Sequence, residues 1–380
     1  MSRFEDMLLA NFHSKVDGID RWCAKLDWAT YRVRIGDLES IDDILANARN
    51  SNVANVEARL YSRINYLEGL YQFFRVGIQS ALPKLLRARA IASGCERSDQ
   101  TYALVNSWLA SIYRNLGDWV GMTQALAALV ESECAKTVEV RFRLYLVLGD
   151  ICQEVELYEQ ASVWYGLARD SALKLGDDAA LSAMLYNRAS ITIYNLRLQY
   201  VGGGFPRLND GRVALEAASA QNYTHYINDQ SLPWGFDLMS GQLLMLKGEA
   251  QAALDLFTAK RVEDALEQWP EVNALREADI FRCRSLLQDR NALRASEVVE
   301  SAQDLLKKIE FVEAPGDQAI AIHSIAVGLR EVDPSYEKVL LKMSTERLAL
   351  VIEDRSREME EFVRFISLYG DRLERLEKQK

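Results

Sequence analysis

Apolar side chains recur at every third or fourth position along most of this chain, which is the spacing of amphipathic helices. Short turns separate these stretches. In Leu116-Gly117-Asp118, glycine can take a positive φ and aspartate can cap the next helix. Only 6 prolines and 20 glycines occur among 380 residues, which argues against an all-β protein rich in turns. The pattern predicts an all-α protein, with helix pairs at residues 60–76 and 81–92, 104–116 and 119–130, 142–155 and 158–175, and 236–246 and 250–259.

The helical stretches repeat at intervals of about forty residues. The clearest copy combines Leu148-Gly149 with Ala161, Tyr165 and Ala168. Periods of this length are typical of solenoids of stacked helix pairs, because a single pair cannot bury its own apolar face. Aligned on Gly149, a small residue recurs at Ala29, Gly69, Ala110, Gly149, Ala189, Gly241 and Cys283, at intervals of 40, 41, 39, 40, 52 and 42 residues.

The motif around Gly149 resembles the tetratricopeptide (TPR) repeat. That family places a large residue and glycine in its first helix, and alanine, an aromatic residue and alanine in its second. Leu148, Gly149, Ala161, Tyr165 and Ala168 match this order. The common TPR spacing is 34 residues, so the longer repeat here is similar to the TPR regions of bacterial regulators and of some diguanylate cyclases. Over about residues 20–345, the resemblance implies a right-handed superhelical solenoid of helix pairs.

The resemblance also implies a binding site, because TPR first helices line a concave groove. Arginines at such positions can clamp carboxylates with paired hydrogen bonds, and tyrosines supply contact area at low entropic cost. The alternative is that each residue is an ordinary surface or packing residue. The positions that the alignment predicts to line the groove are Arg63, Tyr66, Arg114, Arg143, Asp150, Gln153, Tyr186, Ser190, Tyr194 and Gln242.

The last part of the chain has a different pattern. A helix start at Asp333-Pro334 divides a repeat array of residues 1–333, with an irregular insert at about 200–235, from a long helix of residues 334–380. Heptad spacing predicts that this helix forms a homodimeric coiled coil, and the alternative is that it folds back onto the array. The predicted dimerisation residues are Leu348, Ile352, Met359, Phe362, Ile366, Tyr369, Leu373 and Leu376.

Composition limits the partners and the location. The formal charge of −10 argues against nucleic acid as a partner, because binding phosphates requires clustered lysine and arginine. No run of eighteen apolar residues occurs, and the first fifteen residues do not resemble a signal peptide. The five cysteines are widely spaced and odd in number. We therefore expect a cytoplasmic protein with reduced thiols and no membrane span.

No motif predicts catalysis, and we expect neither an enzyme nor a cofactor. The glycine run at 202–204 lacks the Gly-Lys-Ser/Thr ending of a phosphate loop and is expected to be a loop between repeats. His13, His225 and His323 are dispersed, so no metal site is expected. A Gly-x-Ser-x-Gly nucleophile motif is also absent.

The sequence therefore favours a non-catalytic scaffold or regulator. We expect it to hold a peptide or protein segment in the groove and to self-associate through its C-terminal helix. The alternative, implied by the diguanylate-cyclase resemblance, is the sensory input module of a bacterial signalling system whose output domain is absent or separate.

Overall fold

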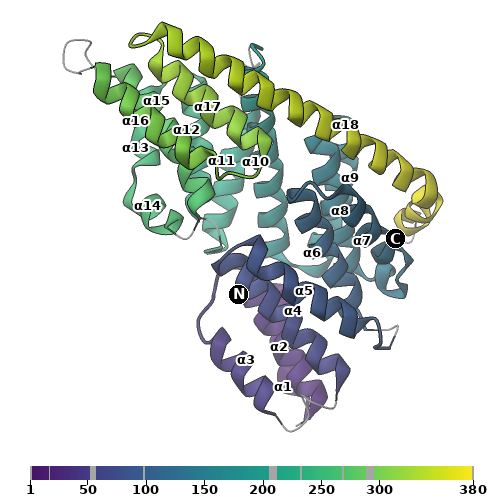
Figure 1. The fold of residues 1–380 in the computed structure, drawn as a ribbon. Coiled ribbons are helices and arrows are strands. Elements are labelled where there is room, and N and C mark those ends of the chain that lie inside the picture. The colour runs from purple at the N-terminus through teal and green to yellow at the C-terminus, as the bar shows by residue number, and fades with distance from the viewer. Residues whose placement is uncertain are drawn as a thin grey trace. The chain divides into compact units, whose positions relative to one another are not determined.

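The computed structural model describes residues 2–16, 18–51, 57–96, 99–204, 212–231, 233–267, 269–287 and 295–378, except for the side chains of Arg212 and Pro233. Within these ranges all regular structure is helical, which confirms the predicted all-α class (Figure 1). Contacts divide the chain into a first unit of residues 1–187, 222–232 and 357–380, and a second unit of residues 188–221 and 233–356. Residues 205–211 and 232 of the predicted insert lie outside the described ranges. The division into residues 1–333 and 334–380 stays a prediction.

The helices follow one another closely along the chain. In the first unit they are α1 (Arg3–Ser14), α2 (Ile19–Arg34), α3 (Ile41–Asn50), α4 (Ala58–Arg75), α5 (Ile78–Ala92), α6 (Thr101–Asn115), α7 (Trp119–Glu131), the 3₁₀ turn η1 (Glu133–Lys136), α8 (Val138–Glu154) and α9 (Tyr158–Leu175). In the second unit they are α12 (Pro233–Leu246), α13 (Ala250–Phe257), α14 (Lys260–Leu266), α15 (Pro270–Leu287), α16 (Ala295–Ile309) and α17 (Pro315–Leu329). Both units include parts of α10 (Asp178–Val201), α11 (Arg212–Tyr226) and α18 (Pro334–Lys378).

The first unit is an array of helix pairs. Helix α4 packs on α5, α6 on α7, and α8 on α9, while the first helices α2, α4, α6 and α8 also contact one another in sequence. The turn between α6 and α7 forms as predicted, since Gly117 has a φ of 69° and the Asp118 carboxylate accepts a hydrogen bond from the Gly121 amide at 2.8 Å. Short turns of this kind make each pair a helical hairpin.

The recurring small residue marks the close approach between the two helices of a pair. A methyl group added to Gly149 would lie 2.8 Å from the Tyr165 ring, and one added to Gly241 would lie 2.6 Å from the Phe257 ring. In both pairs the facing ring comes sixteen positions after the glycine. This contact explains why the sequence repeats a small residue with a large residue at a fixed distance behind it.

We expect Gly149→Ala to lower the free energy of unfolding by about 1–3 kcal/mol, because overpacking forces neighbours out of place. Tyr165 cannot easily move, since its hydroxyl donates to Asp150 at 2.9 Å. Gly166→Ala is the matched control, because nothing lies within 4 Å of an added methyl there and alanine favours a helix interior by roughly 1 kcal/mol. Urea unfolding of the two variants should shift in opposite directions, and equal shifts would contradict this account.

The second unit contains one helix that is too short to be predicted from the periodicity of its apolar residues. Helix α12 packs on α13, and α16 contacts both α15 and α17. Helix α14 was not predicted, because it has only 7 residues and buries just Val262 and Leu266. Fewer than two full turns give no repeating apolar pattern to detect.

All five cysteines are present as thiols and not as disulfides. Four of the five are buried, and Cys95 is half-buried. Burial raises the pKa of Cys152 to about 12, so this thiol is protonated and unreactive at neutral pH.

Candidate functional site

All ten predicted groove residues lie on first helices. Seven of them, from Arg63 to Tyr186, belong to the first unit, whereas Ser190, Tyr194 and Gln242 belong to the second. Tyr194 packs beside Leu198 there, which is the packing role left open by the sequence. The ten residues lie on five helices: α4 contains Arg63 and Tyr66, α6 contains Arg114, α8 contains Arg143, Asp150 and Gln153, α10 contains Tyr186, Ser190 and Tyr194, and α12 contains Gln242.

Buried polar side chains in the pairs of the first unit are concentrated on the first helices. Among the described residues of the second helices α5, α7 and α9, only Ser171 is buried and polar. Helices α4, α6 and α8 together bury Ser62, Asn65, Thr101, Asn106, Ser107, Arg143, Asp150 and Gln153. We call these residues, with Tyr66, Trp108 and the charged residues Asp27, Arg34, Arg63, Asp99, Arg114, Glu139, Glu154 and Asp177, the polar face.

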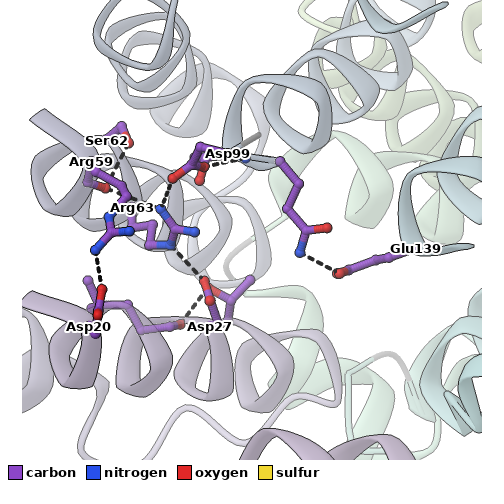
Figure 2. Close-up of polar contacts among 11 residues, drawn as sticks. Asp20, Asp27, Arg59, Ser62, Arg63, Asp99 and Glu139 are labelled. Atoms are coloured by element: carbon purple, nitrogen blue, oxygen red, sulfur yellow. Dashed lines mark hydrogen bonds and ion pairs between the residues drawn. The ribbon is translucent and has the colours of Figure 1, made fainter. Parts of the chain in front are cut away.

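Arg63 links three neighbouring segments at one end of the polar face (Figure 2). Its guanidinium donates to Asp27 at 3.1 Å and to Asp99 at 2.6 Å. Burial alone would raise the pKa of Asp99, but Arg63 and the hydrogen bonds from Arg63 and Thr101 hold it below its ordinary value. The side chains of Arg63 and Asp99 are 11% and 5% exposed, so this ion pair is largely shielded from water.

Arg143 is a buried cation in the middle of the polar face. Its guanidinium carbon lies 4.5 Å from the Trp108 ring centroid, a cation–π distance. Within the described ranges, no carboxylate lies within ion-pair distance of Arg143. Burial, followed by the charge of Arg34, lowers its pKa to about 10, so it stays protonated at neutral pH. Nearby, Glu139 accepts from Gln100 at 2.9 Å, and burial raises the pKa of this carboxyl.

Asp150 is the centre of a second network. Its two oxygens accept from the Tyr165 hydroxyl and the Asn187 amide, each at 2.9 Å. Arg114 approaches Asp150 at 3.9 Å and Glu154 at 3.3 Å. Burial alone would lower the pKa of Arg114, but these acids raise it. The network joins α6, α8, α9 and α10.

The N-terminal helices also contact the segment that follows the α8–α9 pair. Arg34 of α2 forms a salt bridge with Asp177 at 2.9 Å, and both side chains are buried. The Phe4 amide donates to the Gly176 carbonyl at 3.1 Å. Phe4 and Tyr31 also form a small apolar cluster with Ala179. Segments about 140 residues apart in sequence are therefore held together within the first unit.

These contacts change the interpretation of the predicted arginines. Arg63 and Arg114 already bind carboxylates of this chain, so both have a structural role. Tyr66 is 6% exposed, and burial raises its pKa to about 12. As contacts for a partner, the ten residues remain a prediction.

The partners Asp27, Asp99, Glu139 and Asn187 were not predicted from the sequence. Each pairs with a residue slightly less than one repeat away: Asp27 and Asp99 each lie 36 positions from Arg63, and Asn187 lies 37 from Asp150. A search for opposite charges or amides at this spacing would have found them. Residues at this spacing make contact because equivalent positions on neighbouring first helices lie side by side.

The terminal half of α18 packs on the first unit. Phe362, Phe365, Leu373 and Leu376 are buried in the same apolar cluster as the pairs α4–α9. The Tyr369 hydroxyl donates to Glu131 at 2.8 Å, and Arg372 donates to the Glu131 carbonyl at 2.9 Å. Helix α18 begins at Pro334, as predicted. Its second half folds back onto the helix pairs of the first unit, which is the alternative to a coiled coil.

The buried stripe of α18 differs from the predicted heptad seam. Phe365, outside the seam, is 2% exposed, whereas Ile352 of the seam is 60% exposed. Met359, Ile366 and Tyr369 are half-buried, and Leu348 packs beside Leu198 in the second unit. An α-helix drifts relative to a strict seven-residue repeat, so a straight helix presents a different stripe to a single-chain core. The homodimer remains a prediction.

The described residues contain no group of three or more His, Cys, Asp or Glu side chains arranged to hold a metal ion. Over the same part of the chain, no helix combines the length and apolarity needed to cross a membrane.

Comparison with known proteins supports the fold. No protein-family model matches the chain, and no curated protein matches it. A crystal structure of Rap protein complexed with Competence and Sporulation Factor is similar, with a TM-score of 0.59 and 12% sequence identity. The match covers 93% of this chain and 92% of that one. The chain therefore has an all-α, superhelical repeat fold, as the sequence predicted.

Proposed function

We propose that the protein is a non-catalytic, TPR-type scaffold that binds a peptide or protein segment on the polar face of its first unit. The observation that carries this proposal is the concentration of buried polar side chains on first helices, with Ser171 as the one buried polar residue described on the second helices α5, α7 and α9. A purely structural array would bury apolar groups equally well on both helices of a pair, because each buried polar group adds a desolvation cost. The Rap protein of similar fold was solved with a bound factor, which supports the same use of this fold here.

The charges of the polar face favour a basic segment as the partner. Four arginines (Arg34, Arg63, Arg114 and Arg143) face six carboxylates (Asp27, Asp99, Glu139, Asp150, Glu154 and Asp177). Arg34, Arg63 and Arg114 already bond to carboxylates. A partner that offers carboxylates would therefore meet arginines that are mostly paired already, whereas a lysine or arginine of a partner would meet an excess of negative charge.

Glu139→Gln tests this proposal. The amide keeps a hydrogen-bond acceptor for Gln100 and removes a half-buried charge, so we expect the variant to fold normally. Loss of one charge-assisted hydrogen bond should weaken the partner's binding by about tenfold or more. The measurement is capture of partners from lysate, followed by titration of the purified partner.

Glu159→Gln on α9 is the matched control, because Glu159 is exposed on a second helix. We expect it to bind like the wild type. Equal capture by both variants would contradict binding at the polar face.

Self-association through α18 would need a surface other than its buried stripe. The apolar side chains that α18 leaves exposed include Ile352, Val363 and Leu368, at 60%, 54% and 72%. Light scattering of the whole chain measures the mass of the particle in solution directly.

The alternative function, a sensory input module of a signalling system, rests on the sequence resemblance alone.

A further inference from the structure

A cluster of cationic and aromatic side chains lies in the second unit and shares no residue with the polar face. Arg282 of α15 places its guanidinium carbon 5.1 Å from the ring centroid of Tyr200 on α10. The Tyr200 ring meets the imidazole of His323 on α17 edge to face, with centroids 5.2 Å apart. Three helices therefore converge on one point, where Arg282 is 5% exposed and His323 is half-buried. Tyr200 is also half-buried, so two of the three side chains are partly exposed.

Asp279, which lies on the same helix as Arg282, already bonds to another arginine. Asp279 accepts from Arg197 at 2.7 and 2.9 Å, and it also accepts from the Ser324 hydroxyl at 2.9 Å. Within the described ranges, no carboxylate lies within ion-pair distance of Arg282. Asp279 therefore neutralises Arg197, and Arg282 stays without a carboxylate partner among the described residues.

Hydrogen-bond donors in the cluster outnumber its acceptors. The Arg282 Nε is buried, with no hydrogen-bond partner among the described residues. The Tyr200 hydroxyl accepts from Arg282 at 3.3 Å, and no acceptor for its own hydrogen occurs in the part of the chain that the structure describes. No described residue forms a hydrogen bond with the His323 ring either. Three helices thus contribute donors without acceptors at one place.

The electrostatic potential at this place is positive. Burial lowers the pKa of His323 to about 4, and the charges of Arg282, Arg197 and Arg330 lower it further in the same direction. Glu337 neutralises Arg330 at 2.8 Å, which leaves Arg282 as the unpaired cation. A buried guanidinium without a counter-ion is costly, and an anion would supply both the missing charge and the missing acceptors.

We propose that Arg282, Tyr200 and His323 form a binding site for an oxyanion, the carboxylate or phosphate group of a small ligand. Arg282 supplies the charge, and the Tyr200 hydroxyl and the neutral His323 imidazole donate hydrogen bonds. The site is independent of the proposed peptide-binding function. It lies in the other unit and shares no residue with the polar face.

Phosphate and succinate titrations of the full-length protein test this proposal, with sodium chloride at matched ionic strength as the blank. The protein has three histidines, so ¹⁵N-histidine labelling gives three pairs of ring nitrogen signals, and His323→Gln assigns the pair of interest. We expect phosphate, succinate or both to shift the His323 signal saturably and to raise the melting temperature. A response to phosphate alone would identify a phosphate ligand, and a response to succinate alone would identify a carboxylate ligand.

Arg282→Met should lose the response, with binding at least about tenfold weaker, because a charge-assisted hydrogen bond is removed. Without an anion this variant should melt at or above the wild-type temperature, because an uncompensated buried charge has been removed. Arg284→Gln is the control, since Arg284 is exposed on the same helix. An unchanged His323 signal in wild type with both anions, or an equal response in Arg282→Met, would overturn the proposal.

Discussion

Replacing Arg63 with methionine is expected to lower the free energy of unfolding by about 3–5 kcal/mol, because removing one partner of a buried ion pair leaves an uncompensated charge. Arg63 bonds to Asp27 and Asp99 at once, and Asp99 is 5% exposed. Methionine keeps the aliphatic volume, so the expected loss comes from the charge. Urea unfolding at neutral pH measures it.

The size of this loss should depend on pH. In the wild type the pKa of Asp99 is lowered, so its contribution to stability is present above the ordinary carboxyl pKa and is lost as the pH falls. Without Arg63, burial raises the pKa of Asp99 instead, and the variant regains stability as the carboxyl becomes protonated. The difference between wild type and variant should therefore narrow between neutral pH and about pH 4.

Arg59→Met is the matched control for Arg63→Met. Arg59 lies one turn earlier on α4 and pairs with Asp20, whose side chain is 66% exposed. Exposed pairs contribute at most about 1 kcal/mol. Equal losses in the two variants would show that burial of the ion pair is not the cause.

Truncating Phe362 to alanine is expected to destabilise the protein by about 3–5 kcal/mol, the usual cost of removing a buried phenyl ring. Phe362 is 5% exposed and belongs to the apolar core of the first unit. Phe365→Ala should have a similar effect, and the double variant should be less than additive because the two residues are neighbours. Thermal and urea unfolding measure these changes.

Leu368→Ala controls for this experiment, because Leu368 lies on the same helix with 72% of its surface exposed. Its effect should stay within about 0.5 kcal/mol. The homodimer hypothesis makes a different prediction for Phe362→Ala. The stability of a dimer rises with protein concentration, so the loss caused by breaking its seam would also depend on concentration. A loss that is independent of concentration would support packing on the same chain.

Helix class and pairing could be predicted because they depend on local periodicity. Helix α9 has the predicted bounds, and Gly149 and Tyr165 meet as the TPR-like motif implies. The long-range polar contacts could not be predicted in the same way. The choice of Asp27 and Asp99 as partners for Arg63 depends on how successive pairs are rotated relative to one another, and a single repeat does not contain that information.

The C-terminal helix shows a second limit of sequence reasoning. The heptad pattern correctly predicted a long amphipathic helix. It could not distinguish a homodimer from packing within one chain, because an apolar stripe can be buried in either way. Glu358 is fully buried and Ile352 is exposed, so polarity alone did not identify the packed face. The deciding factor was the presence of an uncovered apolar surface on the array.

The salt bridge between Arg34 and Asp177 has a consequence for how the first unit unfolds. In an open repeat protein each module touches only its neighbours, and terminal modules can fray independently. Here the N-terminal helices are bonded directly to the segment that follows the α8–α9 pair, so neither end of this row of modules is free to detach first. The backbone amides of α2 and α10 should therefore lose their protection against hydrogen exchange together, in one cooperative opening. A linear array would instead show protection that decreases toward its ends.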